Sequence, residues 1–270
     1  MSAPACITRR RLLTGGGVVA LLAAVPFRAA ATANHDLDAV LREAGISGCF
    51  AHLDTATDRL TLANGVRAAE RFIPASTFKF ANALIALETG AVRDEHEVFR
   101  WDGSAQPFPA WQQDLTFGEA FAVSSVPVFQ QVARRIGPAT YEAWLDRLGY
   151  GNGAVGDTVD RFWLDGPLRI SAIEQAGFLA ALGLGELPLS QASQAIVRRM
   201  ALVEMPGAAT LHLKTGWCTA CAPDVGWWTG WVDRGGRIDS FALNIDMTGA
   251  AELPRRAEIG KAMLRRLDLW

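Results

Sequence analysis

The chain is predicted to adopt an α+β fold, with one antiparallel sheet built from both chain ends, flanking helices, and a mainly helical region beside it. Strand-like segments bounded by turn residues cluster near both ends of the chain. Between them, apolar residues recur at the three- and four-residue spacing of amphipathic helices. No repeat or low-complexity linker divides the 270 residues, and 50% of them are hydrophobic, so we expect a sizeable core.

The first 33 residues are predicted to be a cleavable export signal. A basic start at Arg9, Arg10 and Arg11 precedes an apolar stretch over residues 15–25 and small residues at 31–33. The arginines followed by two leucines resemble a twin-arginine signal, with an ordinary secretory signal as the alternative. The apolar stretch is shorter than the roughly 20 residues that cross a bilayer. We therefore expect a periplasmic or secreted protein that begins near Asn34 and has no stable membrane span.

Five segments of the remaining chain have the composition and boundaries of strands. A turn joins the first two, and the glycine pair Gly235 and Gly236 is a strong hairpin signal between the last two. The predicted strands are residues 48–54, 59–63, 210–216, 226–232 and 238–247. Strands from both ends of the chain are expected to meet in one sheet.

Six segments have helical periodicity and are punctuated by Gly and Pro. The first begins near Ser76, which is placed to cap it, and runs to the natural stop at Gly90. The other predicted helices are residues 115–136, 139–148, 171–182, 191–205 and 254–267. The middle of the chain is therefore mainly helical.

Charge and cysteine content exclude two classes of function. Without the signal the chain has 22 basic and 28 acidic residues, a net charge of −6 that argues against nucleic acid as a partner. Cys49, Cys218 and Cys221 remain, so at most one internal disulfide can form. The spacing of Cys218 and Cys221 suits a redox or zinc pair, but the four histidines supply no matching ligand cluster. We expect a local disulfide or buried thiols, and no metal or other cofactor.

The segment Pro74-Ala75-Ser76-Thr77-Phe78-Lys79 places a hydroxyl and an amine three residues apart, on one face of a helix start. The helix that follows is mostly apolar, so burial would favour the neutral amine of Lys79, which can activate Ser76 as a nucleophile. Taken alone, the pattern has low specificity. On its own it favours a helix cap at Ser76 beside a solvated lysine.

Four further segments make the pattern specific. They are Ser124-Ser125-Val126, Tyr150-Gly151-Asn152, Phe162-Trp163-Leu164 and Lys214-Thr215-Gly216. In this order and at these intervals, residues 34–270 resemble the catalytic domain of the class D serine β-lactamases. The resemblance implies the fold of serine β-lactamases and penicillin-binding proteins. It also implies hydrolysis of penicillin-type β-lactams, which gives antibiotic resistance.

The resemblance also implies roles for individual residues. Ser76 would attack the lactam carbonyl, and Lys79 would act as general base after taking up CO2 as a carbamate. Trp163 would steady that carbamate through its indole N–H, and its alternative interpretation is core packing. Ser124 would relay a proton to the leaving nitrogen, although a serine there can also bond a helix carbonyl. Val126 would form an apolar wall.

Substrate binding is implied for the segment around Lys214. Lys214, Thr215 and Gly216 would form the site for the substrate carboxylate together with Arg256, for which Arg255 is the adjacent competitor. The backbone N–H groups of Ser76 and Trp217 would form the oxyanion hole. The Tyr150-Gly151-Asn152 segment is expected to support the pocket without taking part in catalysis.

Three alternatives remain at this point. A β-lactam sensor domain acylates without turnover, but it normally follows membrane helices. A penicillin-binding transpeptidase or class A enzyme would carry Ser-Asp-Asn or a relative in place of Ser124-Ser125-Val126. A non-catalytic binding protein would not need the complete set of reactive residues. The sequence leaves open the choice between monomer and homodimer, and the acceptance of carbapenems and cephalosporins.

Overall fold

The computed structural model describes residues 30–270. Residues 1–29 of the predicted export signal lie outside the described part, and its last four residues form the first strand. The strands are β1 (Ala30–Ala33), β2 (Gly48–Asp54), β3 (Arg59–Ala63), β4 (Arg71–Phe72), β5 (Val98–Phe99), β6 (Leu115–Thr116), β7 (Ile170–Ser171), β8 (Leu202–Val203), β9 (Thr210–Cys218), β10 (Asp224–Asp233) and β11 (Ile238–Met247). The α-helices are α1 (His35–Glu43), α2 (Gly65–Ala69), α3 (Lys79–Glu88), α4 (Phe117–Ala122), α5 (Val126–Ile136), α6 (Pro138–Leu148), α7 (Ala172–Leu184), α8 (Gln191–Met200) and α9 (Leu253–Arg266). Short 3-10 helices are η1 (Ala75–Phe78), η2 (Pro109–Trp111) and η3 (Ala250–Glu252).

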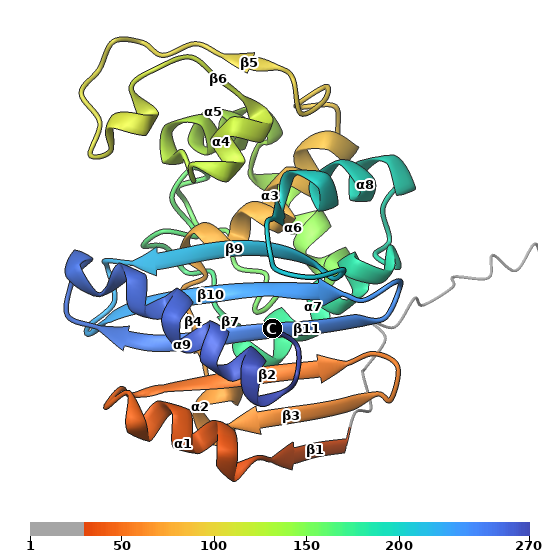
Figure 1. Cartoon of the computed structure of the whole chain (residues 1–270). Helices are drawn as coiled ribbons and strands as arrows, with labels where there is room; N and C mark the ends of the chain where they lie inside the picture. The colour runs from red at the N-terminus through yellow and green to blue at the C-terminus, as the bar shows by residue number, and fades with distance from the viewer. Residues whose placement is uncertain (1–29) are drawn as a thin grey trace, which may run out of the picture.

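The central feature is a seven-stranded sheet in the order β1-β3-β2-β11-β10-β9-β8 (Figure 1). It joins strands from both ends of the chain, because β11 pairs with β2, and this confirms the predicted α+β architecture. Only the edge pair β1 and β3 is parallel, a detail the predicted all-antiparallel sheet missed. The predicted start near Asn34 would remove β1, and that cleavage stays a prediction.

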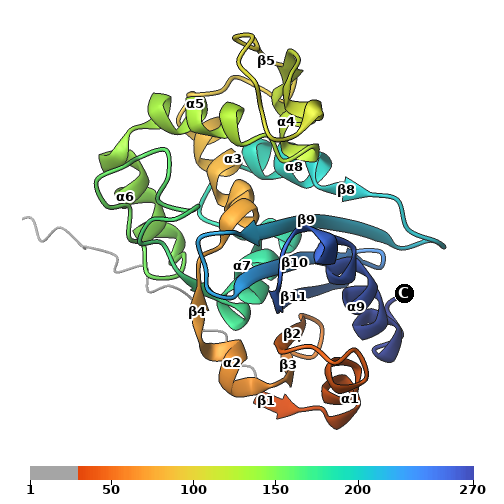
Figure 2. The ribbon, with the colours of Figure 1, turned by 90° about the vertical axis from the view of Figure 1, so that its left-hand side faces the viewer.

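Helices cover both faces of this sheet (Figures 1 and 2). Helices α1 and α9 contact each other on one face, and α7 packs against β2, β10 and β11 on the other. The approach of α9 is close: a Cβ on Gly260 would lie 2.2 Å from the Trp228 ring, so only glycine fits there. The sheet is therefore buried on both sides along β10 and β11, whose central residues are buried and mostly apolar.

The helical region lies beside the β9 end of the sheet and is organised around α3 (Figure 2). Eight consecutive residues of α3, from Lys79 to Ala86, are buried. Helices α5 and α8 pack against it, and η1 connects it to β9. A helix that is apolar on all sides belongs in a core, and α3 carries the reactive segment into this one.

Two of the predicted helices are wrong in extent. The predicted helix 115–136 is broken, because Ser124 adopts a left-handed φ of 61° and Pro127 has no N–H to continue a helix from residue 123. Ser125 caps the new helix α5 through the Val128 N–H, so the chain restarts there. The predicted helix 191–205 ends at Met200, where the chain leaves to form the edge strand β8.

Candidate active site

Ser76 and Lys79 meet as the spacing predicts. The Lys79 Nζ donates a 2.9 Å hydrogen bond to the Ser76 Oγ. Ser76 does not cap the helix, contrary to the alternative interpretation. It lies inside η1, whose N-cap is Pro74, and Ala75 before it has a left-handed φ of 48°. Because it is not used as a cap, the partly exposed Ser76 hydroxyl is available to a ligand.

Lys79 is fully buried, so the interpretation as a solvated lysine is wrong. Its Nζ lies 5.1 Å from the centroid of the Phe129 ring. Burial lowers the pKa of Lys79 well below its usual value, and the nearby charge of Lys214 lowers it further. The neutral amine is thus favoured next to Ser76, and a neutral amine can accept a proton or react with an electrophile.

Trp163 lies in the aromatic core directly behind the reactive segment. Its ring centroid is 5.5 Å from that of Phe78 and 5.0 Å from that of Phe162. Its Nε1 is buried and has no hydrogen-bond partner among the described residues. Core packing alone would leave this donor unsatisfied, which typically costs about 1–3 kcal/mol. The Trp163 indole N–H is therefore a buried donor that no described residue uses.

The Tyr150-Gly151-Asn152 segment supports this region, as predicted. The Tyr150 ring packs edge-on against Phe78 at 5.6 Å. Asn152 donates to the Pro167 carbonyl and accepts from the Arg169 N–H, so it holds residues 167–169, a few residues after Trp163. Burial raises the pKa of Tyr150 above its usual value, so it stays a neutral phenol.

Ser124 and Val126 lie in the loop between α4 and α5. The left-handed backbone at Ser124 is uncommon for a residue with a side chain. Both residues are partly exposed, whereas Ser125 between them is buried as the cap of α5. The strained turn thus presents alternate residues, Ser124 and Val126, on the accessible side.

Lys214 is the second buried lysine of this region. It lies on β9, only 5% exposed, and its Nζ is 5.8 Å from the Phe121 ring centroid. Burial lowers its pKa to about 7, with a smaller contribution from the charge of Arg256. Phe121 and Phe129, whose centroids are 6.4 Å apart, connect the surroundings of Lys214 and Lys79. Sequence reasoning missed both rings as site residues, although Phe129 stands three residues after Val126 on the same helix.

The remainder of β9 brings the predicted binding residues against the reactive segment. Thr215 is partly exposed, and a Cβ on Gly216 would lie 2.9 Å from the Pro74 carbonyl oxygen. Only a glycine allows the strand to approach η1 this closely. A cavity of about 180 Å³ opens beside Lys214 and Thr215. Its other lining residues are Phe121, Ala122, Met200, Ala201, Leu202, Val203 and Leu213.

The two candidate arginines point to different places. The Arg256 Nη1 donates a 2.7 Å hydrogen bond to the Gly216 carbonyl, so it lies beside β9. Arg255 instead pairs with Glu252 and donates to the Ala44 carbonyl, on the other side of α9. Arg256 is therefore the arginine near Lys214. Burial lowers its pKa to about 10.

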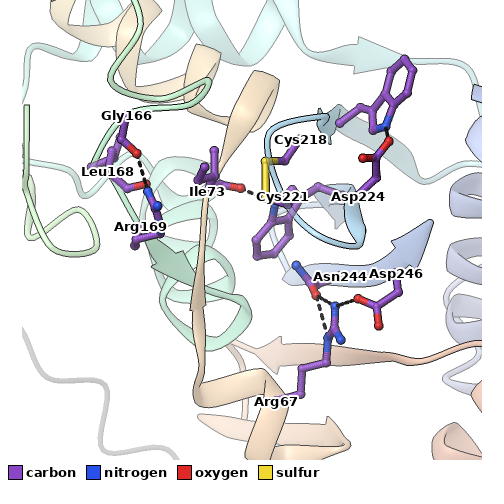
Figure 3. The surroundings of a disulfide bond; sticks show 12 residues. Arg67, Ile73, Gly166, Leu168, Arg169, Cys218, Cys221, Asp224, Asn244 and Asp246 are labelled. Carbon is purple, nitrogen blue, oxygen red and sulfur yellow. Dashed lines mark hydrogen bonds and ion pairs between the residues drawn. A yellow bond between two sulfur atoms is a disulfide. The ribbon is translucent and has the colours of Figure 1, made fainter. Parts of the chain in front are cut away.

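Trp217 lies near this end of β9. A disulfide follows it, as Figure 3 shows. The Trp217 Nε1 donates to Asp224 at 2.9 Å across the β9–β10 turn. Cys218 and Cys221 form the disulfide, one of the two states expected for them, and Cys49 is a buried free thiol. Within residues 30–270, no three His, Cys, Asp or Glu side chains are grouped as metal ligands would be. No helix in that range is long and apolar enough to cross a membrane.

Comparison with known proteins identifies this arrangement. Residues 48–265 match the penicillin binding protein transpeptidase domain family. The structure resembles the crystal structure of FUS-1 (OXA-85), a class D β-lactamase from Fusobacterium nucleatum subsp. polymorphum, with a TM-score of 0.86 and 35% identity. That match covers 88% of this chain and 99% of the other. The chain belongs to the class D β-lactamase family.

Curated relatives in the class D family agree over most of the chain. Beta-lactamase OXA-5 of Pseudomonas aeruginosa is 42% identical over 222 residues, covering 81% of this chain and 83% of the relative. Beta-lactamase OXA-48 of Klebsiella pneumoniae is 44% identical over 200 residues, covering 74% and 76%. The family resemblance drawn from the motifs is thereby confirmed, and so is the serine β-lactamase fold.

Proposed function

We propose that the protein hydrolyses the β-lactam ring of penicillin-type antibiotics through an acyl-enzyme on Ser76 and thereby gives resistance. One observation carries this proposal above all: a fully buried lysine amine, favoured in its neutral form, lies 2.9 Å from a partly exposed serine hydroxyl. A lysine of ordinary pKa would be an ammonium at neutral pH and could not accept the serine proton. Membership of the class D family supports the choice of substrate.

The surroundings of Lys79 fit a carbamate formed with CO2. A neutral amine is the form that reacts with CO2, and the unpartnered buried Nε1 of Trp163 can donate to a carbamate oxygen. When formed, the carbamate supplies a base for the Ser76 proton and for the water that later releases the product. Trp163 in this proposal holds and orients that base, and the Phe129 ring keeps water away from it.

The remaining residues bind the substrate and move its protons. Ser124, presented by its strained turn, is proposed to pass a proton to the leaving lactam nitrogen. Lys214 and Arg256 are proposed to attract the substrate carboxylate, with Thr215 as a hydrogen-bond donor. The Ser76 and Trp217 backbone N–H groups are proposed to bind the developing oxyanion. The close fit of Gly216 against Pro74 supports that pairing, because it sets the position of β9 relative to η1.

Export is part of the proposal. We propose that residues 1–33 direct the protein to the periplasm or the outside of the cell, where it would meet an antibiotic before the antibiotic reaches its target. An oxidising compartment also agrees with the Cys218–Cys221 disulfide.

The test is steady-state hydrolysis of a chromogenic penicillin-type or cephalosporin-type β-lactam, with and without added bicarbonate. We expect turnover that bicarbonate increases, and a loss of about 10⁴-fold or more in Ser76→Ala and Lys79→Ala. Ser190→Ala, far along the chain at the cap of α8, serves as a matched control and keeps full activity. A protein that is acylated once and never turns over would instead be a sensor. Full activity in Lys79→Ala would exclude the carbamate.

A further inference from the structure

The five residues that connect β9 to β10 have little else to hold them besides the disulfide. Among the described residues, the backbone of Thr219, Ala220, Cys221, Ala222 and Pro223 makes no hydrogen bond outside the strand ladders. Their side chains make no hydrogen bond either, and the covalent bond from Cys221 to Cys218 is what ties the turn to β9. Most of this turn is exposed. The Trp217–Asp224 hydrogen bond at its base is the remaining side-chain tie across the turn.

The disulfide reaches from this exposed turn into the core behind the nucleophile. Cys218 is fully buried, in one apolar cluster with Ile73, Ala75 and Trp227, and Cys221 packs against the same cluster. The Trp227 Nε1 donates to the Ile73 carbonyl at 2.9 Å, which connects β10 to the segment before Ser76 (Figure 3). Ala75, in its left-handed conformation, directly precedes Ser76. The two cysteines therefore pack in the same cluster as the residues that precede Ser76, and Cys218 directly follows Trp217 on β9.

We propose that the Cys218–Cys221 disulfide is a positioning device that makes hydrolysis dependent on redox conditions. While the bond is intact, it ties the turn to Cys218, which the ladder with β10 holds at the end of β9, and so adds a restraint next to the Trp217 N–H. When it is broken, the turn is released from the cluster and that donor moves relative to Ser76. This inference rests on the proposed function, because it concerns the oxyanion hole of the same site.

A dithiol such as dithiothreitol supplies the two electrons and two protons that reduce the Cys218–Cys221 disulfide. Its thiolate attacks a disulfide sulfur, the Sγ–Sγ bond breaks, and a mixed disulfide forms. The second thiol of the reagent then closes it into a cyclic disulfide, leaving two cysteine thiols after the transfer of two electrons and two protons. Cys221 is half-buried whereas Cys218 is fully buried, so we expect attack at the Cys221 sulfur.

The expected kinetic effect is specific. An oxyanion donor acts in the transition state, so its displacement lowers kcat and leaves KM nearly unchanged. A misplacement of about 1 Å can cost up to 100-fold in rate, and we expect about a tenfold or larger fall in kcat on reduction. A purely structural role would lower the melting temperature and the fraction of active protein without changing kcat per active site.

The experiment compares oxidised and dithiothreitol-reduced protein, with reduction verified by alkylation and active sites counted by stoichiometric acylation. We expect kcat per acylated site to fall and to recover on reoxidation. The double variant Cys218→Ser/Cys221→Ser should have the kcat of the reduced protein and should not respond to dithiothreitol. Cys49→Ser should show the same fall in kcat on reduction as the unchanged protein. A change below twofold in kcat per site on reduction would overturn the inference. Absence of hydrolysis in the oxidised protein would instead refute the proposed function.

Discussion

The charge of Lys214 provides the sharpest test of the substrate site. Because burial lowers its pKa to about 7, Lys214 loses its charge as the pH rises above neutrality. At a pH well above that pKa, each further unit reduces the charged fraction about tenfold. If the ammonium binds the substrate carboxylate, kcat/KM therefore falls above neutral pH and approaches a tenfold fall per pH unit at about pH 8 and higher. Arg256, whose pKa is lowered only to about 10, stays charged over most of this range.

Protonation of the two buried lysines should affect the activity in opposite directions. As the proposed base, Lys79 has to be neutral, so we expect protonation of Lys79 to produce the acid limb of the profile. As the proposed carboxylate-binding group, Lys214 has to be charged, so we expect its deprotonation to produce the alkaline limb. A bound carboxylate stabilises the Lys214 ammonium, so the alkaline limb of kcat should lie at higher pH than that of kcat/KM.

The assay measures both constants from pH 5.5 to 9.5 for one penicillin and for its carboxyl ester. We expect the alkaline limb of kcat/KM for the acid and none for the ester, with the acid limb present for both. Lys214→Arg should move the alkaline limb upward by more than one pH unit, because the guanidinium stays charged. The chain has only three lysines, and Lys261→Arg, on α9 beside Trp270, is the matched control that leaves the profile unchanged. An alkaline limb that is identical for acid and ester would refute the reasoning.

Three further predictions follow from the site. Trp163→Phe keeps an aromatic ring but removes the buried indole N–H, and it should lower kcat about 100-fold. Added bicarbonate should restore part of the activity. Equal steady-state activity of Trp163→Phe and the wild type would contradict the proposed role of the indole N–H. Ser124→Ala and Ser124→Gly should lose the same factor, about 10²–10⁴ in kcat. In urea unfolding, Ser124→Gly should be about 0.5–1 kcal/mol more stable than Ser124→Ala, because glycine adopts the left-handed φ of 61° at this position without a steric cost. Between pH 7 and 10.5 the unfolded chain binds a proton at Lys214 that the folded chain lacks. Stability should therefore rise by up to about 1.4 kcal/mol per pH unit from this lysine, and Lys214→Met should lose that share of the slope in urea titrations.

The strands could be predicted from sequence because their signals are local. Residues 48–54, 59–63 and 238–247 coincide with β2, β3 and β11 as observed. Each alternates or runs apolar between turn residues, and the Gly235-Gly236 turn has two left-handed glycines. The parallel pairing of β1 with β3 depends on where the chain before Asn34 lies, which no local pattern specifies.

The break inside the predicted helix 115–136 could not be predicted in the same way. The apolar periodicity continues across it, since Phe117, Phe121, Val128 and Val132 are all buried. A single residue, Ser124, changes the chain direction by adopting a left-handed conformation, and serine has little preference for it. The structure shows what this break achieves: it brings Phe121 toward Lys214 and Phe129 toward Lys79. Those contacts join residues distant in sequence, so the motif spacing could indicate the lysines but not the rings around them.

The charge balance of the site explains why two lysines are buried there at all. Lys79, Lys214 and Arg256 converge, and the pKa of each is lowered by burial, with no carboxylate among the described residues raising any of them. Burying an unpaired cation is costly in a protein that only has to be stable. The cost is understandable if anions arrive during function. The proposed carbamate would place one negative charge beside Lys79, and the substrate carboxylate would bring another to Lys214 and Arg256. The same shortage of negative charge would therefore favour the proposed uptake of CO2 by Lys79 and the proposed capture of an anionic substrate by Lys214.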